Sequence, residues 1–117
     1  MAEQPVIYHN PSCGTSRNAL AALREAGAEP KVVEYLKTGW TRDQLTALFA
    51  KAGLTPGEAV RRRNLPDDVA AALEKAKTDD ALLDAMVKHP ILVERPFVVT
   101  AKGAKLCRPA ETVKTLL

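Results

Sequence analysis

The alternation of apolar and polar residues predicts a strand, a helix and a second strand in the first part of the chain. The apolar stretch from about Pro5 to Tyr8 is typical of a short strand. From about Thr15 to Ala26 apolar residues recur at helical spacing, and Gly27 follows directly, as expected at a helix end. Lys31 to Leu36 predicts a second strand. This order indicates a βαβ unit with parallel strands and a right-handed crossover.

The middle of the chain is predicted to be helical, because signals that start helices recur there. Thr41 and Gln44 form a capping-box pattern ahead of an apolar stripe. The run Thr55-Pro56-Gly57-Glu58 repeats the pattern, with proline at the first helical position. Two more helices are expected, one from Pro66 to about Lys77 and one that Thr78 caps and His89-Pro90 ends.

The last part of the chain returns to strand signals. Ile91 to Val93 and Arg95 to Thr100 predict strands, and a turn at Lys102-Gly103 leads into a further strand from Ala104 to Cys107. A final helix is expected from about Ala110. Without the middle helices, this element order resembles that of the thioredoxin-like fold.

We therefore predict an α/β protein, a three-layer α/β/α sandwich with a mixed sheet. Residues 1–117 are expected to form a single domain, in which the helices between about 56 and 88 are an inserted lobe beside the active-site edge. A chain of 117 residues has the common size of one domain.

Composition and charge limit the kinds of partner that this protein is expected to bind and the compartment in which it is expected to act. A hydrophobic fraction of 46% with 26% charged residues is ordinary for a globular protein and argues against disorder. The net charge of +3 favours small anions, but no concentrated basic stripe indicates nucleic acid. We see neither a signal-peptide pattern nor an apolar run near the roughly 20 residues that span a bilayer. With two cysteines, too few for a disulfide scaffold, we expect a cytoplasmic protein with no nucleic-acid or membrane partner.

The turn between the first strand and the first helix carries a thiol, Cys13. Its neighbours from Asn10 to Ser16 are turn formers, which argues against the buried and inert cysteine that is commoner in cores. A cysteine at a helix N-terminus faces unpaired N–H groups and the positive end of the helix dipole, and both favour the thiolate. The same N–H groups can bind an oxyanion. Cys13 is therefore predicted to be a nucleophile beside an anion site.

Neighbouring residues exclude two thiol motifs. Ser16 stands three residues after Cys13, so the dithiol Cys-x-x-Cys motif is absent. The Cys-x5-Arg loop of tyrosine phosphatases is also absent, because position 19 is Ala19 and Arg17 falls two residues early. A redox cycle would need a resolving thiol from elsewhere, and anion binding would need arginines from distant segments.

Three further residues have both a chemical and a structural interpretation. His9, at the end of the first strand, could stabilise the thiolate or relay protons, or could be structural. Cys107 is a candidate internal resolving thiol, but its place in a predicted strand favours a buried, inert residue. His89 is expected to be structural. The spacing of the cysteines and histidines does not match a structural zinc site, so no metal is expected.

Several motifs in order resemble those of one family. The run from His9 to Asn18 (His-Asn-Pro-Ser-Cys-Gly-Thr-Ser-Arg-Asn) is similar to the active-site signature of the glutaredoxin-coupled arsenate reductases. The likeness runs almost from end to end, with matching stretches at Arg61-Arg62-Arg63-Asn64, Thr78-Asp79-Asp80, His89-Pro90-Ile91-Leu92, Arg95-Pro96-Phe97-Val98-Val99-Thr100 and Leu106-Cys107-Arg108-Pro109. The thioredoxin-like fold of that family, with its helical insertion, agrees with the element order above.

The resemblance assigns roles to individual residues. It implies that Cys13 is the nucleophile, that His9 activates it, and that Arg62, Arg95 and Arg108 bind the oxyanion. The run Arg61-Arg62-Arg63 leaves open which arginine faces the site, although the spacing to Asn64 favours Arg62. A planar guanidinium suits a tetrahedral oxyanion and also favours a nearby thiolate. A cis peptide bond is predicted at Arg95-Pro96, where thioredoxin-like proteins carry one.

The implied activity is the reduction of arsenate to arsenite, with glutathione as thiol co-substrate, glutaredoxin as protein partner and no bound cofactor. Two alternatives remain open. One is a regulatory protein similar to the Spx-type thiol sensors, which bind RNA polymerase; Ser16 and the arginine set argue against it. The other is a glutathione-dependent thiol oxidoreductase, against which the three arginines also argue.

Overall fold

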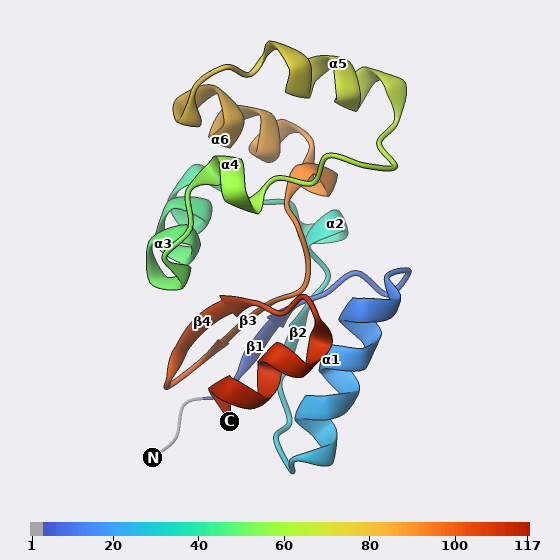
Figure 1. Cartoon of the computed structure of the whole chain (residues 1–117), viewed down its shortest axis with the longest axis vertical. Coiled ribbons are helices and arrows are strands. Elements are labelled where there is room, and N and C mark those ends of the chain that lie inside the picture. The colour runs from blue at the N-terminus through green and yellow to red at the C-terminus, as the bar shows by residue number, and fades with distance from the viewer. Residues whose placement is uncertain (1–3) are drawn as a thin grey trace. The chain divides into compact units, whose positions relative to one another are not determined.

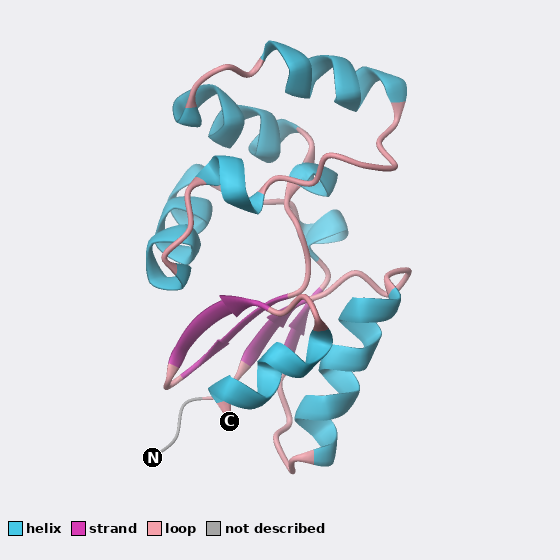
Figure 2. Ribbon diagram, viewed as in Figure 1, coloured by secondary structure: helices cyan, strands magenta, loops and turns pink. Residues whose placement is uncertain are grey.

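The computed structural model describes residues 4–117, and it contains a four-stranded sheet (Figures 1 and 2). The strands are β1 (Val6–Tyr8), β2 (Lys31–Val33), β3 (Phe97–Thr100) and β4 (Gly103–Leu106), in the order β2-β1-β3-β4. β1 and β2 are parallel, whereas β3 is antiparallel to both β1 and β4. The mixed sheet and the α/β class predicted from the sequence are thereby confirmed.

The chain divides into two compact units. The first, called the sheet unit, comprises residues 1–38 and 95–117, and the second, called the helical unit, comprises Gly39–Glu94. The bounds of the predicted insertion, 56 to 88, and the single-domain interpretation stay predictions. The helical unit includes that segment and begins earlier in the chain.

The core of the sheet unit lies between one face of the sheet and two helices, α1 (Gly14–Glu25) and the 3₁₀ helix η2 (Ala110–Leu116) (Figure 1). Ile7 and Val98 are register partners on β1 and β3, so their side chains share that face. Both are fully buried. The cluster as a whole consists of Ile7, Ala19, Leu23, Val98, Cys107, Val113 and Leu116. Burying this apolar surface holds α1, and with it the turn at its N-terminus, against the sheet.

The helical unit consists of α3 (Arg42–Ala52), α4 (Pro56–Ala59), α5 (Asp67–Lys75), α6 (Asp79–Lys88) and the 3₁₀ helix η1 (Pro90–Leu92). The predicted starts are confirmed. Thr41 and Thr55 both form complete capping boxes, and the Thr78 side chain accepts a hydrogen bond from the backbone N–H of Ala81. These bonds satisfy N–H groups that a helix leaves without partners at its N-terminus.

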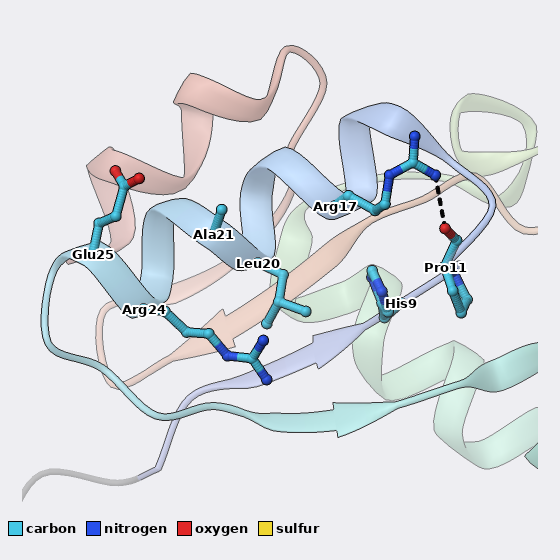
Figure 3. Close-up of a pocket in the computed structure, with 7 residues that line it drawn as sticks. All are labelled: His9, Pro11, Arg17, Leu20, Ala21, Arg24 and Glu25. Atoms are coloured by element: carbon cyan, nitrogen blue, oxygen red, sulfur yellow. Dashed lines mark hydrogen bonds between the residues drawn. The ribbon is translucent and has the colours of Figure 1, made fainter.

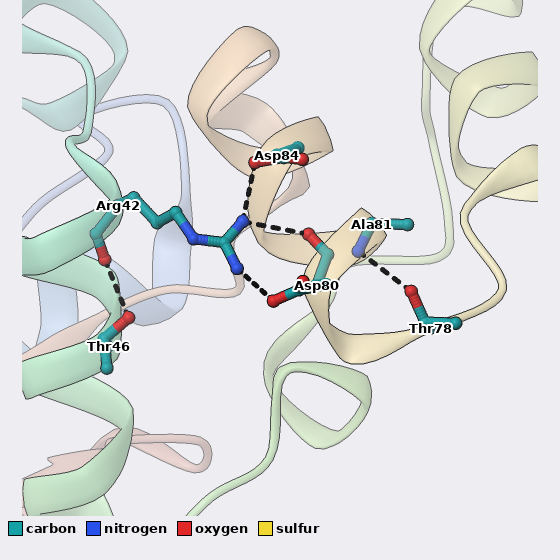
Figure 4. A network of polar contacts seen from close by, with 6 residues as sticks. All are labelled: Arg42, Thr46, Thr78, Asp80, Ala81 and Asp84. Carbon is teal, nitrogen blue, oxygen red and sulfur yellow. Dashed lines mark hydrogen bonds and ion pairs between the residues drawn. The ribbon is translucent and has the colours of Figure 1, made fainter.

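A polar network joins two helices of this unit (Figure 4). Arg42 of α3 donates to Asp84 Oδ1 at 2.6 Å and to the backbone oxygen of Asp80 at 3.1 Å, and it also pairs with the Asp80 carboxylate. The Thr46 hydroxyl donates to the Arg42 carbonyl at 2.9 Å. Because the carboxylates are exposed, solvent screens the ion pairs, and the network mainly fixes how α3 and α6 lie against each other.

Two strand predictions are wrong. The segment predicted as strand up to Leu36 leaves the sheet after Val33 and forms a short helix, α2 (Tyr35–Thr38), whose Tyr35 side chain is fully buried. Ile91–Val93, also predicted as a strand, falls largely in η1, because Pro90 favours the first turn of a helix. Only Val93 makes a β-bridge, to Val60. No helix among residues 4–117 combines the length and apolar character needed to cross a bilayer.

Candidate active site

Cys13 is the N-cap residue of α1. Its backbone is extended, with φ of −98° and ψ of 121°. Its N–H donates to the Asn10 carbonyl at 3.0 Å, and its carbonyl accepts from the N–H of Arg17 at 3.0 Å. The thiol is therefore held at the mouth of the helix by the β1–α1 turn, as the sequence predicts. Cys13 is 9% exposed, so solvent reaches only a small part of this residue.

The surroundings of Cys13 favour its thiolate. Burial alone raises the pKa of the thiol, but the N–H of Ser16, the charge of Arg95 and hydrogen bonds from Arg95 and Arg108 together outweigh it, so the pKa lies below its ordinary value. Arg108 Nη1 lies 3.7 Å from the sulfur. A larger fraction of Cys13 is therefore ionised near neutral pH than in an ordinary cysteine.

Arg95 and Arg108 reach the same place because they flank one hairpin. Phe97 of β3 pairs with Leu106 of β4, so residues just outside this pair lie opposite each other at the open end of the hairpin. Arg108 Nη1 also donates to the Arg95 carbonyl at 3.1 Å. The predicted cis bond at Arg95-Pro96 is confirmed, and Arg108-Pro109 is cis as well, which the sequence did not predict. Two arginines 13 positions apart thus share one site.

Arg62 belongs to the helical unit. Its side chain is exposed and donates to the Gly57 carbonyl at 3.4 Å. Its neighbours are engaged more closely: Arg61 is buried and donates from Nε to the Arg63 carbonyl at 3.0 Å, and Arg63 lies 3.8 Å from the carboxylate of Glu94. A contribution of Arg62 to anion binding stays a prediction.

His9 is buried beside the same turn. Its Nδ1 lies 2.6 Å from the Ser16 hydroxyl, and burial lowers the pKa of the imidazole, with Glu34 acting in the opposite direction. A neutral ring is therefore favoured. The activating role predicted for His9 stays a prediction, and the side-chain contact of the imidazole is with Ser16.

A groove of about 520 Å³ runs along α1 next to this turn (Figure 3). His9 and Pro11 lie at one end of it, and Leu20 and Arg24 line its length. Arg17 folds back over the turn and donates to the Pro11 carbonyl at 2.8 Å. This hydrogen bond links α1 to the β1–α1 turn. Arg95 and Arg108, in contrast, come from the C-terminal part of the chain.

Two residues of the site are absent from the predictions: Ser16 as a bonding partner, and Asn10. Ser16 is fully buried, and its hydroxyl accepts from the Asn10 N–H at 3.0 Å. The Asn10 side chain accepts from the Ser12 N–H at 2.9 Å. The abundance of turn formers between residues 10 and 16 is the signal that could have pointed to them, since these side chains bond readily to nearby backbone.

Cys107 lies in the core, fully buried, and burial raises the pKa of its thiol to about 11. It therefore has the properties of an inert packing residue. Within the described part of the chain, no three His, Cys, Asp or Glu residues are grouped so that they could hold a metal ion.

The sheet, the N-cap thiol and the two arginines define a class: a thioredoxin-like protein with one activated cysteine beside cationic side chains. Comparison with known proteins identifies the family. Residues 8–116 match the ArsC family, and the chain belongs to it.

Individual proteins similar to this chain are named arsenate reductases. Over 112 residues the chain is 55% identical to the arsenate reductase ArsI2 of Synechocystis, covering 96% of this chain and 80% of the relative. It is 47% identical over 111 residues to an arsenate reductase of Escherichia coli, covering 95% and 79%. A solved arsenate reductase from Vibrio cholerae superposes with a TM-score of 0.87 at 37% identity and full coverage of both chains.

Proposed function

We propose that this protein is an arsenate reductase that converts arsenate to arsenite, with Cys13 as the nucleophile. The observation that carries the proposal is the Cys13 sulfur at the N-terminus of α1, 3.7 Å from the Arg108 guanidinium, in a chain whose relatives are named arsenate reductases. A thiolate matched to a bound oxyanion is what the first chemical step requires.

Substrate binding is assigned to the positive groups around the sulfur. Arsenate carries two negative charges near neutral pH, and the forked donors of Arg95 and Arg108 suit a tetrahedral oxyanion. N–H groups at the N-terminus of α1 are assigned as further donors to the anion. Arg62 is assigned as a third arginine that binds the same anion. Charge of this kind stabilises the transition state if it is strongest where negative charge develops.

The first step is attack of the Cys13 thiolate on arsenic. A sulfur–arsenic bond forms, an arsenic–oxygen bond breaks, and the departing oxygen leaves as water after taking up protons. Arsenic stays in the +5 state, so this step consumes no electrons. The product is a covalent arseno-cysteine intermediate, and the lowered pKa of Cys13 increases the fraction of the nucleophile that is ionised for this step.

Reduction then uses thiols from outside the chain. Glutathione replaces a second oxygen on arsenic, again with loss of water. A glutaredoxin thiolate attacks the glutathione sulfur and forms a mixed disulfide, and the electron pair of the broken sulfur–arsenic bond reduces arsenic to the +3 state. Hydrolysis of the remaining sulfur–arsenic bond releases arsenite and the Cys13 thiol. Ser16 in place of a second cysteine and the buried Cys107 both favour an external reductant.

The scheme requires neither a bound metal nor a flavin or nucleotide, because the electrons arrive as thiols. We place it in the cytoplasm, where glutathione and glutaredoxin remain reduced.

The decisive experiment measures arsenate-dependent NADPH oxidation in a mixture of glutathione, glutaredoxin and glutathione reductase. Wild type should turn over, Cys13→Ser should be inactive, and Cys107→Ser, the matched loss of the other thiol, should retain activity. Turnover that persists in Cys13→Ser would disprove the proposal. Glutathione-dependent turnover of a mixed disulfide without any arsenate-dependent rate would favour the thiol oxidoreductase alternative.

A further inference from the structure

Ser16 occupies the position at which a dithiol protein would carry its second cysteine, and it makes a set of bonds that the proposed chemistry leaves unused. Its side chain is fully buried. The hydroxyl oxygen lies 2.6 Å from His9 Nδ1 and accepts the N–H of Asn10 at 3.0 Å. A buried hydroxyl with two partners at such distances is ordered, because each bond is costly to leave unmade in a low-dielectric interior.

The hydrogen bond from Asn10 limits how the Ser16 hydroxyl can bond to His9. The Asn10 N–H can only donate, so it uses a lone pair of the Ser16 oxygen. The single proton of the hydroxyl is then available for His9 Nδ1, which accepts it when the ring is neutral. Burial and the positive charges of Arg24 and Arg17 favour the neutral ring, while the carboxylate of Glu34 opposes them. A neutral ring that accepts the Ser16 proton carries its own proton on Nε2.

The same residue also contacts the nucleophile. The backbone N–H of Ser16 donates to the Cys13 sulfur, and it is the leading contribution that favours the thiolate there. The Asn10 carbonyl in turn accepts the N–H of Cys13 at 3.0 Å. The bond between Ser16 and Asn10 thus closes a ring that starts and ends at Cys13 and fastens the turn to α1.

We propose that Ser16 is a positioning residue for Cys13: its hydroxyl fixes His9 as the Nε2–H tautomer and fastens the Asn10 turn to α1, so that the Ser16 N–H stays directed at the sulfur. His9 then influences Cys13 through Ser16. The consequence for turnover rests on the proposed arsenate reductase activity, whereas the geometry can be tested on the free protein.

The first test is long-range ¹H–¹⁵N NMR of the imidazole of His9 in the free protein. Wild type should show the Nε2–H tautomer alone, with Nδ1 as an acceptor. Ser16→Ala should show a mixture of tautomers, Ser16→Thr should restore the wild-type pattern, and Asn18→Ala, on the exposed side of α1, should leave it unchanged. An unchanged tautomer in Ser16→Ala would overturn the assignment.

The second test is the rate of Cys13 alkylation by iodoacetamide against pH in a Cys107→Ser background. Ser16→Ala should slow the reaction at neutral pH about threefold to tenfold, the loss expected for one hydrogen bond that holds the turn. His9→Ala should act in the same direction, and the double variant should be little slower than Ser16→Ala alone. Additive effects would refute the route through Ser16.

Neither test needs arsenate. If wild type failed to reduce arsenate while both tests gave the expected results, the proposed function would be disproved and the role of Ser16 would be supported. If turnover were normal in Ser16→Ala and the tautomer unchanged, the role of Ser16 would fall and the proposed function would stand. Circular dichroism and thermal unfolding of Ser16→Ala separate loss of the turn from loss of the fold.

Discussion

Removing the charge of Arg108 should make Cys13 a weaker nucleophile at neutral pH. The guanidinium donates from Nη1 both to the Cys13 sulfur, at 3.7 Å, and to the Arg95 carbonyl, at 3.1 Å. Arg108→Ala deletes both contacts and one positive charge. The thiolate then loses a stabilising neighbour while the protonated thiol loses little, so the pKa of Cys13 should rise toward its ordinary value.

The size of the effect follows from the distance. Two unit charges 3.7 Å apart attract by about 1 kcal/mol at the dielectric constant of water and by about 4.5 kcal/mol at an effective dielectric constant of about 20. Arg108 is partly exposed, so solvent places the interaction toward the lower limit. That limit corresponds to a roughly fivefold loss of thiolate near neutral pH, since about 1.4 kcal/mol is tenfold.

The assay is alkylation of Cys13 by iodoacetamide over a wide pH range, with Cys107→Ser as background so that one thiol reacts. The midpoint of the rate profile should move to higher pH in Arg108→Ala. Arg108→Lys keeps the charge but loses the fork, so it should lie between the variant and wild type. Lys114→Ala, an exposed cation on η2, gives the same change in net charge and should leave the profile in place.

A profile of Arg108→Ala that superposes on wild type would refute the reasoning, because the distance would then have no electrostatic consequence. An equal shift of the midpoint in Lys114→Ala would also contradict the reasoning, because the net charge of the protein rather than the contact with Arg108 would then determine the pKa of Cys13.

Three further predictions concern stability and the second cysteine. Because the folded-state pKa of Cys107 is raised to about 11 from an ordinary value of 9.0, the folded protein should lose stability as pH rises from about 9 to 11. Cys107→Ser should reduce that decline in denaturant unfolding curves measured at several pH values, and equal declines would contradict the burial argument. Leu23→Ala, at a fully buried position of the core cluster, should lower the free energy of unfolding by about 3–5 kcal/mol in urea titrations, whereas Leu36→Ala, at an exposed position, should change it little. Thr41→Ala removes a capping box and should cost about 1 kcal/mol by the same measurement; a cost no larger than for Thr46→Ala would argue against the cap.

Local signals account for most of the correct fold predictions. The caps at Thr41, Thr55 and Thr78 involve residues within three positions of each other, so their bonds can be inferred from sequence alone. The hairpin of β3 and β4 was likewise predictable from its turn at Gly103, where φ is 141°. Such contacts do not depend on where the rest of the chain lies.

The wrong predictions occur where contacts between residues distant in sequence determine the local structure. Tyr35 has a high strand propensity, yet its side chain is fully buried in a short helix, so tertiary packing overrode the local preference. In the site, Arg95 and Arg108 were assigned by resemblance to a family, since no local pattern indicates that a hairpin brings them to Cys13. The contact between His9 and Ser16 joins residues seven positions apart, and no local sequence pattern indicates it.

The order of the strands has a consequence during synthesis on the ribosome. β1, which leads into the Cys13 turn, pairs with β3, whose residues are made about ninety positions later, so this pairing cannot form until β3 has emerged. The nascent chain therefore presents Cys13 without Arg95 or Arg108. The contribution of these two arginines to the lowered pKa of Cys13 is therefore absent until the β3–β4 hairpin forms.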